Sequence, residues 1–213
     1  MSWFSFRTAR GEAAAHPVTA PAQTATEPEV HKSLALPSVL AAMARVPKPH
    51  VLDLGPAIGS NVEYLSEFGC RLSIEDLFLT RTSAADGEEL GPEFFEQLVP
   101  LPNGPEFDVV FAWDLFNYLS RKELGRLTAR LRQACKPGAQ VLALIWIHKS
   151  IPAQPIRFRF RGKDQLVYDR RTALERPGPR FQPAEINQLM SGFQVDRSFL
   201  LRHGIQEYLF VRE

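Results

Sequence analysis

An acid and two glycines lie close together in a segment that reads V-L-D-L-G-P-A-I-G-S. Asp53 comes first, and Gly55 and Gly59 follow it with Ala57 between them. Glycine lets a backbone turn sharply and approach a ligand closely. A helix that begins at Ser60 would direct its free N–H groups and the positive end of its dipole toward the same point. The segment therefore predicts a binding loop for a small molecule.

The residues of this loop narrow the choice of ligand. A dinucleotide site uses the pattern G-x-G-x-x-G, in which the second glycine makes room for a pyrophosphate. Here Ala57 stands at that position and Ser60 at the sixth. A carboxylate at Asp53 would also repel a phosphate, because like charges would lie close together. A ligand that carries an ammonium group and no phosphate suits the loop better.

A second acid favours one ligand of this kind. Asp76 closes the strand predicted over residues 71–75, where a carboxylate can accept hydrogen bonds from both hydroxyls of a ribose, and Glu75 lies beside it. S-adenosylmethionine has a ribose and an ammonium group but no phosphate, so we predict it as the cofactor. The structural alternative is that Asp53 forms a turn and Asp76 caps a helix.

Methyl transfer demands little of a protein beyond alignment of the acceptor and exclusion of water, although a base can help when the acceptor is an O–H or N–H group. Asp114 follows the strand predicted over residues 107–112 and is a candidate for that base or for a ligand of an acceptor amine. A helix cap or a turn is the equal alternative for Asp114. Trp113 could cover a cationic sulfonium with its ring face or belong to the core. We expect His148, after the next strand, to be solvated.

Strands and helices alternate along the chain around these residues. Apolar runs predict strands over residues 50–54, 71–74, 107–112, 141–147, 193–201 and 205–211, with a weak strand near residue 99. Helical patterns begin at Pro37, Ser60, Pro92, Ser120 and Pro183, and each serine has a glutamate three residues later, as in a capping box. Alternation of this kind means parallel strands joined by right-handed crossovers. We therefore expect an α/β fold, a doubly wound seven-stranded mostly parallel sheet with a C-terminal antiparallel hairpin.

The segment of residues 148–180 departs from this alternation, and we interpret it as a hairpin or lid insertion. Phe158 and Phe160 alternate with Arg157, Arg159 and Arg161, and a turn precedes a return strand. The arginines could grip an anionic substrate. The favoured alternative is that they form the solvated face of a two-stranded ribbon that buries its phenylalanines.

Composition places this chain among ordinary globular proteins. Its 213 residues suit one compact domain, with 45% hydrophobic residues, 23% charged residues and a formal net charge of +1. We interpret residues 1–32 as a disordered N-terminal arm and residues 33–213 as the domain. The small net charge disfavours nucleic acid and an anionic membrane as partners. Cys70 and Cys135 predict neither a disulfide framework nor a zinc site. No apolar run is long enough to span a bilayer, so we expect the default location, the cytoplasm.

Several of these segments together resemble the class I S-adenosylmethionine-dependent methyltransferase family. They are the loop segment V-L-D-L-G-P-A-I-G-S-N-V-E-Y-L, the acidic I-E-D, the strand F-D-V-V-F-A-W-D, and the helix pattern L-x-x-L-x-x-x-L that ends in K-P-G. The resemblance covers about residues 36–213, and it departs from the family's three alternating glycines at Ala57. It implies a Rossmann-like methyltransferase fold and a transferase that methylates a small-molecule acceptor.

The resemblance also implies a cofactor site. Its residues would be Asp53, Gly55, Ala57, Gly59, Glu75, Asp76, Leu77, Trp113 and Asp114. The spacing favours Asp76 over Glu75 as the ribose ligand. Two alternatives stay open, a methyltransferase-like binding module without catalysis and a methyltransferase of RNA or protein. The segment 114–117 reads D-L-F-N where RNA-base enzymes of this fold often carry Asn/Asp-Pro-Pro, which counts against base methylation.

Overall fold

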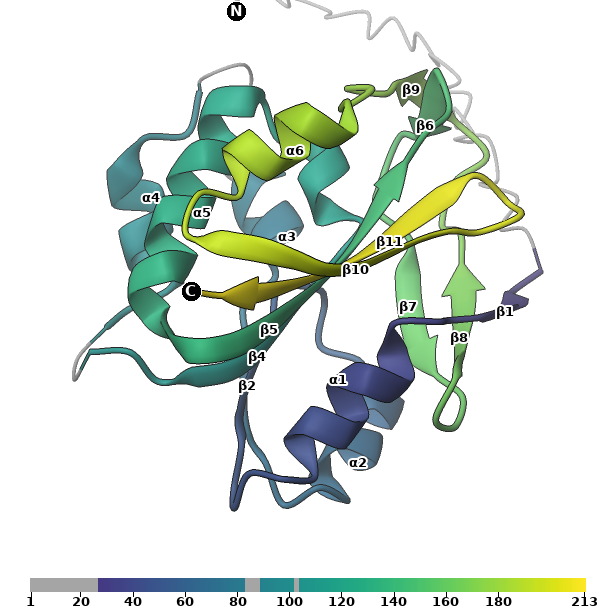
Figure 1. Ribbon diagram of the computed structural model, residues 1–213. Helices are drawn as coiled ribbons and strands as arrows, with labels where there is room; N and C mark the ends of the chain where they lie inside the picture. The colour runs from purple at the N-terminus through teal and green to yellow at the C-terminus, as the bar shows by residue number, and fades with distance from the viewer. Residues whose placement is uncertain (1–26, 83–88, 102–103) are drawn as a thin grey trace, which may run out of the picture.

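A computed structural model describes residues 27–82, 89–101 and 104–213, and its main sheet has six strands in the order β10-β11-β5-β4-β2-β3 (Figure 1). The strands are β2 (His50–Asp53), β3 (Arg71–Ile74), β4 (Phe107–Trp113), β5 (Cys135–Trp146), β10 (Phe193–Leu200) and β11 (Ile205–Arg212). The first four pair in parallel, and β11 and β10 add to β5 antiparallel. The result is an α/β fold with a mixed sheet.

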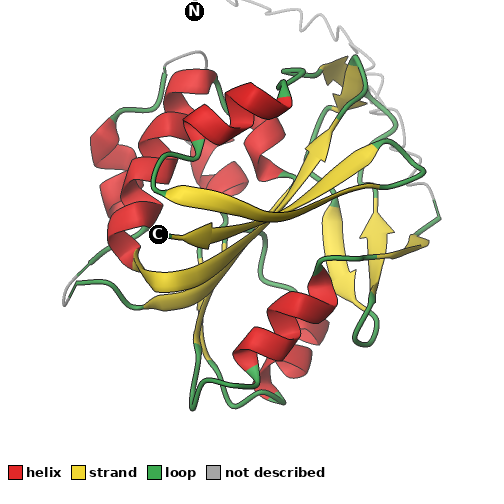
Figure 2. Cartoon of the chain, in the orientation of Figure 1, coloured by secondary structure: helices red, strands yellow, loops and turns green. Residues whose placement is uncertain are grey.

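Helices cover both faces of this sheet, as Figure 2 shows in red. One face carries α1 (Leu36–Met43) and α2 (Gly59–Ser66), whereas the other carries α3 (Leu77–Thr82), α4 (Pro92–Leu98), α5 (Arg121–Ala134) and α6 (Pro183–Leu189). Side chains alternate across a strand. Phe111 and Leu142 therefore pack with the first layer, while Val110 and Val141 pack with the second. Among the described residues, no helix is long and apolar enough to cross a membrane.

Two small antiparallel sheets lie beyond the carboxyl ends of the parallel strands. One has the order β1 (Glu29–Lys32), β8 (Gln165–Asp169) and β7 (Arg157–Phe160), and the other pairs β6 (Ser150–Pro152) with β9 (Glu175–Pro177). The β7–β8 pairing confirms the predicted ribbon, which buries Phe158 and Phe160 and leaves Arg157 exposed. The predicted disordered arm is wrong at its end, because residues 29–32 form β1 along β8. The rest of that arm, residues 1–26, lies outside the described residues.

The prediction of seven strands is wrong by one, because no strand forms near Val99 in the described part of the chain. Val99 ends α4 instead, and its N–H donates to the oxygen of Phe95 at 3.0 Å as part of that helix. Its carbonyl accepts from Arg130 Nε of α5 at 2.7 Å. Partners in α4 and α5 thus use both backbone groups of Val99 that a strand would need. Strand β3 therefore stays at the edge of the sheet.

The two predicted capping boxes differ in outcome. Ser120 accepts from the Glu123 N–H while the Glu123 side chain accepts from the Ser120 N–H, which confirms the box at the start of α5. The box at Ser60 is wrong. Helix α2 begins one residue earlier, at Gly59, and its N-cap residue Ile58 makes no side-chain cap. The polar side chain that matters in this first turn is Asn61, which turns toward β7.

Candidate functional site

The carboxyl ends of three parallel strands bring the predicted acids to one edge of the sheet. Asp53 ends β2, and its carbonyl accepts from the Glu75 N–H beyond β3 at 2.8 Å. The next residue, Leu54, donates to the carbonyl of Phe111 in β4 at 3.0 Å. These bonds carry the ladder past the strand ends, so the loops after β2, β3 and β4 start side by side. This edge is where open α/β sheets bind ligands.

Asp53 is the most constrained of the acids. Its side chain is 2% exposed, and Oδ1 accepts from the Gly55 N–H at 2.9 Å and from Trp113 Nε1 at 2.7 Å. Burial raises the pKa of Asp53 to about 6, against the opposing effect of these two hydrogen bonds, and the charge of Asp76 raises it further. Asp53 thus forms a turn, as the structural alternative has it, and also faces the second predicted acid.

The two glycines and the alanine of the loop lie in different surroundings, and only one position requires glycine. A Cβ on Gly55 would lie 2.9 Å from Trp113 Cδ1, so the close approach of the indole requires glycine there. Gly59 has open space around its Cα and begins α2. Ala57 is exposed and does not adopt a positive φ, so the departure from glycine at this position strains nothing.

Trp113 is both a core residue and a wall of the site. It ends β4 with a φ of 51°, which is a left-handed conformation that side chains other than glycine rarely adopt. Its indole is 4% exposed and stacks between Phe158 of β7, with ring centroids 5.3 Å apart, and Phe111 of β4, at 5.0 Å. The core interpretation of Trp113 is therefore confirmed, while its contact with a sulfonium stays a prediction.

A cleft lined by Asp76 begins at Gly55 and Trp113, the two residues that hydrogen-bond to the buried Asp53. Its inner part, which Gly55, Trp113, Asp114 and Phe158 help to line, has a volume of only about 20 Å³. Its outer part has a volume of about 410 Å³. The two parts share five lining residues, Pro56, Asp76, Phe78, Pro155 and Ile156. The outer cleft has the size of a small-ligand site, and the indole of Trp113 with the ring of Phe158 narrows the inner one.

The residues after β3 divide into three groups by position. Asp76 lines both parts of the cleft, and its Oδ1 also accepts from the Leu79 N–H at 2.9 Å, so it caps α3 as the structural alternative proposed. Glu75 is not among the described residues that line the cleft, and burial raises its pKa. Leu77 is fully buried in the core rather than in the cleft. Phe78, which the sequence analysis did not name, lies in the lining instead.

Asp114 lies at the inner end of this cleft and is almost fully buried. Its Oδ2 accepts from the Ile156 N–H at 3.1 Å, while its Oδ1 has no hydrogen-bond partner among the described residues. Burial raises the pKa of Asp114 to about 7, although the Ile156 N–H and the Trp146 indole favour the charged form. Asn117 fixes the segment, because its Nδ2 donates to the carbonyls of Asp114 and Leu144. A buried carboxyl with such a pKa can exchange a proton near neutral pH.

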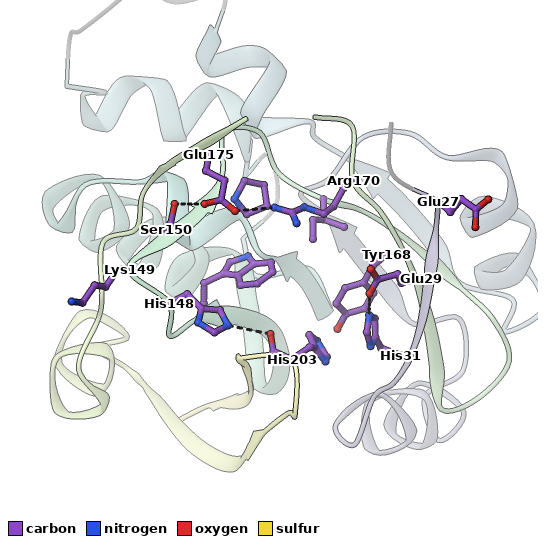
Figure 3. Close-up of a pocket in the computed structure, with 13 residues that line it drawn as sticks. Glu27, Glu29, His31, His148, Lys149, Ser150, Tyr168, Arg170, Glu175 and His203 are labelled. Carbon is purple, nitrogen blue, oxygen red and sulfur yellow. Dashed lines mark hydrogen bonds and ion pairs between the residues drawn. The ribbon is translucent and has the colours of Figure 1, made fainter. Parts of the chain in front are cut away.

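A larger cavity, of about 630 Å³, lies on the other side of Ile156 (Figure 3). Its walls include His31 from β1, Trp146 from β5, Tyr168 from β8, and His148 and His203 from loops. His148 is exposed, as expected, and lies at the rim. Apart from His148, the sequence analysis did not mark these residues, because they come from four separate parts of the chain. Among the described residues, no group of three or more His, Cys, Asp or Glu side chains could hold a metal ion.

Comparison with known proteins gives structural similarity at low sequence identity. No protein-family model matches this sequence, and no curated protein matches it. The PH0226 protein of Pyrococcus horikoshii has a TM-score of 0.48 at 15% identity, over 78% of this chain and 83% of its own. An S-adenosylmethionine-dependent methyltransferase from Mesorhizobium loti has a TM-score of 0.46 at 14% identity, over 83% of this chain and 98% of its own.

A third similar structure is the 1,6-didemethyltoxoflavin-N1-methyltransferase of Burkholderia thailandensis, solved with 1,6-didemethyltoxoflavin and S-adenosylhomocysteine bound. Its TM-score is 0.46 at 17% identity, over 83% of this chain and 76% of its own. All three TM-scores lie below 0.5. Similarity at this level carries no argument about function.

Proposed function

We propose that this chain is an S-adenosylmethionine-dependent methyltransferase that acts on a small molecule. The observation that carries the proposal is the position of two carboxylates at the ends of neighbouring parallel strands. Asp76 lines the cleft, and Asp53 lies buried behind Gly55 and Trp113, which line it. This order suits a ligand with ribose hydroxyls in the outer cleft and an ammonium group further in. The absence of a phosphate from that ligand agrees with two acids in one site, because the charge of Asp76 already disfavours the charged form of Asp53.

The chemistry of the donor groups fits this cofactor. Asp76 would accept from the ribose hydroxyls, Phe78 and Pro56 would flank the nucleoside in the outer cleft, and Asp53 with the Gly55 backbone would face the ammonium end. When bound, the cofactor supplies a methyl group on a sulfonium, which is already an activated electrophile. The inner cleft must widen to admit the amino-acid end, because its volume of about 20 Å³ is too small for it.

Asp114 is the proposed proton acceptor for a hydroxyl or amine on the methyl acceptor. Its unpartnered Oδ1 is free to take a proton, and its raised pKa, about 7, suits a base that works near neutral pH. Ile156 holds the other oxygen in place through its backbone N–H. The lid formed by residues 148–180 would exclude water from this carboxyl.

A small molecule is the proposed acceptor, because a cavity of about 630 Å³ lies beside the cleft. We also propose a cytoplasmic location, which the two free cysteines support. The alternative is a binding module without catalysis. The observation that favours it is Trp113, whose indole fills the inner cleft and bonds to Asp53. An enzyme, unlike such a module, would transfer the labelled methyl group of the bound cofactor to an acceptor and leave S-adenosylhomocysteine.

Substitution of Asp76 tests the proposed cofactor site. Asp76→Ala should weaken binding of S-adenosylhomocysteine tenfold or more, because loss of a charged hydrogen-bond partner costs about 1.5–3 kcal/mol. Glu75→Ala is the matched control and should change the affinity less than twofold. Isothermal titration calorimetry measures both. Equal affinities for wild type and Asp76→Ala, or a loss confined to Glu75→Ala, would show that the ribose ligand is wrongly placed.

A further inference from the structure

Aromatic side chains form much of the wall of the cavity of about 630 Å³ (Figure 3). The ring of His31 lies 4.0 Å from that of His203 and 4.5 Å from that of Tyr168, measured between centroids. The Tyr168 and His203 rings are 5.2 Å apart, and Trp146 of β5 also lines the cavity, with the His148 ring at 6.1 Å from its own. Flat rings on several sides favour a flat ligand, because stacking and edge contacts with aromatic side chains add to the burial of apolar surface.

Polar atoms in the same wall lack partners. Tyr168 is 5% exposed, and its hydroxyl makes no hydrogen bond among the described residues. Arg170 Nε is likewise buried and unpaired. A buried polar group without a partner is costly, so such groups are rare and usually have a role. The Arg170 nitrogen can only donate, and the Tyr168 hydroxyl can donate, so the missing partner is a hydrogen-bond acceptor.

The charges around the cavity nearly cancel. Its lining includes the carboxylates Glu27, Glu29 and Glu175 and the cations Lys149 and Arg170. Arg170 pairs with Glu175 at 3.6 Å, and the Glu175 side chain also accepts from the Ser150 hydroxyl. Burial, with a smaller effect from His31, lowers the pKa of His203 to about 4, so this ring is neutral at pH 7. Such a site gives no net attraction to an anion.

We propose that this cavity binds a neutral, planar aromatic molecule whose oxygen atom accepts a hydrogen bond from Tyr168. Ile156 lines both the cavity and the inner cleft, and its N–H holds Asp114. The bound molecule would therefore be separated from Asp114 by Ile156. Only the further step, that this molecule is the methyl acceptor, rests on the function proposed above.

Titration of the full chain with 2-naphthol at pH 7, without cofactor, tests the proposal. We expect saturable binding of one molecule per chain. Naphthalene lacks the oxygen, decahydro-2-naphthol is not planar and naphthalene-2-sulfonate is an anion, and each should bind at least fivefold more weakly. Failure of 2-naphthol to bind, or tighter binding by any of the three, would overturn the proposal. Titration of S-adenosylhomocysteine is a separate experiment, so failure here is distinct from failure of the proposed function.

One variant places the binding in this cavity. Tyr168→Phe keeps the aromatic ring and removes the unpartnered donor, so it should lower the affinity for 2-naphthol roughly fivefold. It breaks no existing hydrogen bond of the Tyr168 hydroxyl, so it should keep the wild-type melting temperature. Tyr64→Phe is the control, because its hydroxyl donates to the Gly162 carbonyl away from the cavity. Unchanged affinity in Tyr168→Phe would show that the probe binds elsewhere and overturn the assignment.

Discussion

Trp113 is the residue on which access to the proposed cofactor site depends. Its indole N–H is bonded to Asp53, its ring lies over Gly55, and Phe158 covers it from the lid. A cofactor that reaches Asp53 must therefore displace the indole and give up this stack. The apparent affinity for the cofactor therefore equals the intrinsic affinity multiplied by the fraction of molecules in which the indole has moved aside.

Replacement of Trp113 by leucine should raise cofactor affinity. Trp113→Leu removes both the indole N–H on Asp53 and the ring in the inner cleft, so we expect S-adenosylhomocysteine to bind about tenfold more tightly. Phe111→Leu is the matched control, since it removes one stacking partner but leaves the indole in place. Calorimetry on both folded variants measures the effect. Weaker or equal binding by Trp113→Leu would mean that the indole belongs to the bound site.

Asp114 makes stability depend on pH in a defined direction. Its pKa in the folded chain, about 7, exceeds the value near 3.9 expected in the unfolded chain. The folded state then holds the proton more tightly, so stability is full below pH ~4 and falls as the pH rises toward ~7. Relative to wild type, Asp114→Asn should gain roughly 2–3 kcal/mol in free energy of unfolding between pH 5 and pH 8. Denaturant titrations at the two pH values measure this, and a difference that does not change with pH would contradict it.

At the scale of elements, one buried amide joins α2 to the lid. Asn61 Nδ2 donates to the Phe158 carbonyl at 2.8 Å, and its Oδ1 accepts from the Phe160 N–H at 3.1 Å. Strand β7 is the edge of its small sheet, and this side chain takes the position of a neighbouring strand. The lid therefore depends on Asn61 for its outer edge.

Loss of this amide should loosen the lid. Asn61→Ala leaves a buried N–H and a buried C=O without partners, so we expect a fall of about 2–4 kcal/mol in the free energy of unfolding. Amide exchange in β7 should accelerate as well. Asn187→Ala, at an exposed position of α6, is the control and should stay within about 0.5 kcal/mol of wild type. If the two variants were equally stable, the assigned role of Asn61 would be wrong.

The elements that the sequence predicted well are those with a local pattern. Strand β3 and helix α4 match the predicted ranges, and the capping box of α5 is present, because each follows from neighbouring residues. The strand expected near Val99 failed because a partner in α5 takes its carbonyl. The local pattern at Ser60 was equally misleading, since α2 starts where the chain leaves the glycine loop.

At the scale of the whole molecule, contacts between distant parts of the chain build the second cavity. Glu207 of β11 is fully buried, and its Oε2 accepts from the N–H groups of Leu34 at 2.7 Å and Ala35 at 3.0 Å. These bonds tie the segment after β1 to the last strand, and so bring His31 against His203. No spacing along the sequence encodes that contact. The acids of the cleft were predictable because parallel strands end at one edge, whereas the cavity was not.

The central claim is that the cleft lined by Gly55, Trp113 and Asp76 binds S-adenosylmethionine. Calorimetric titration of the wild-type chain with S-adenosylhomocysteine tests it most directly, because this product keeps the ribose and the ammonium group. We predict saturable heat with one molecule bound per chain. No saturable heat at millimolar ligand would contradict the claim.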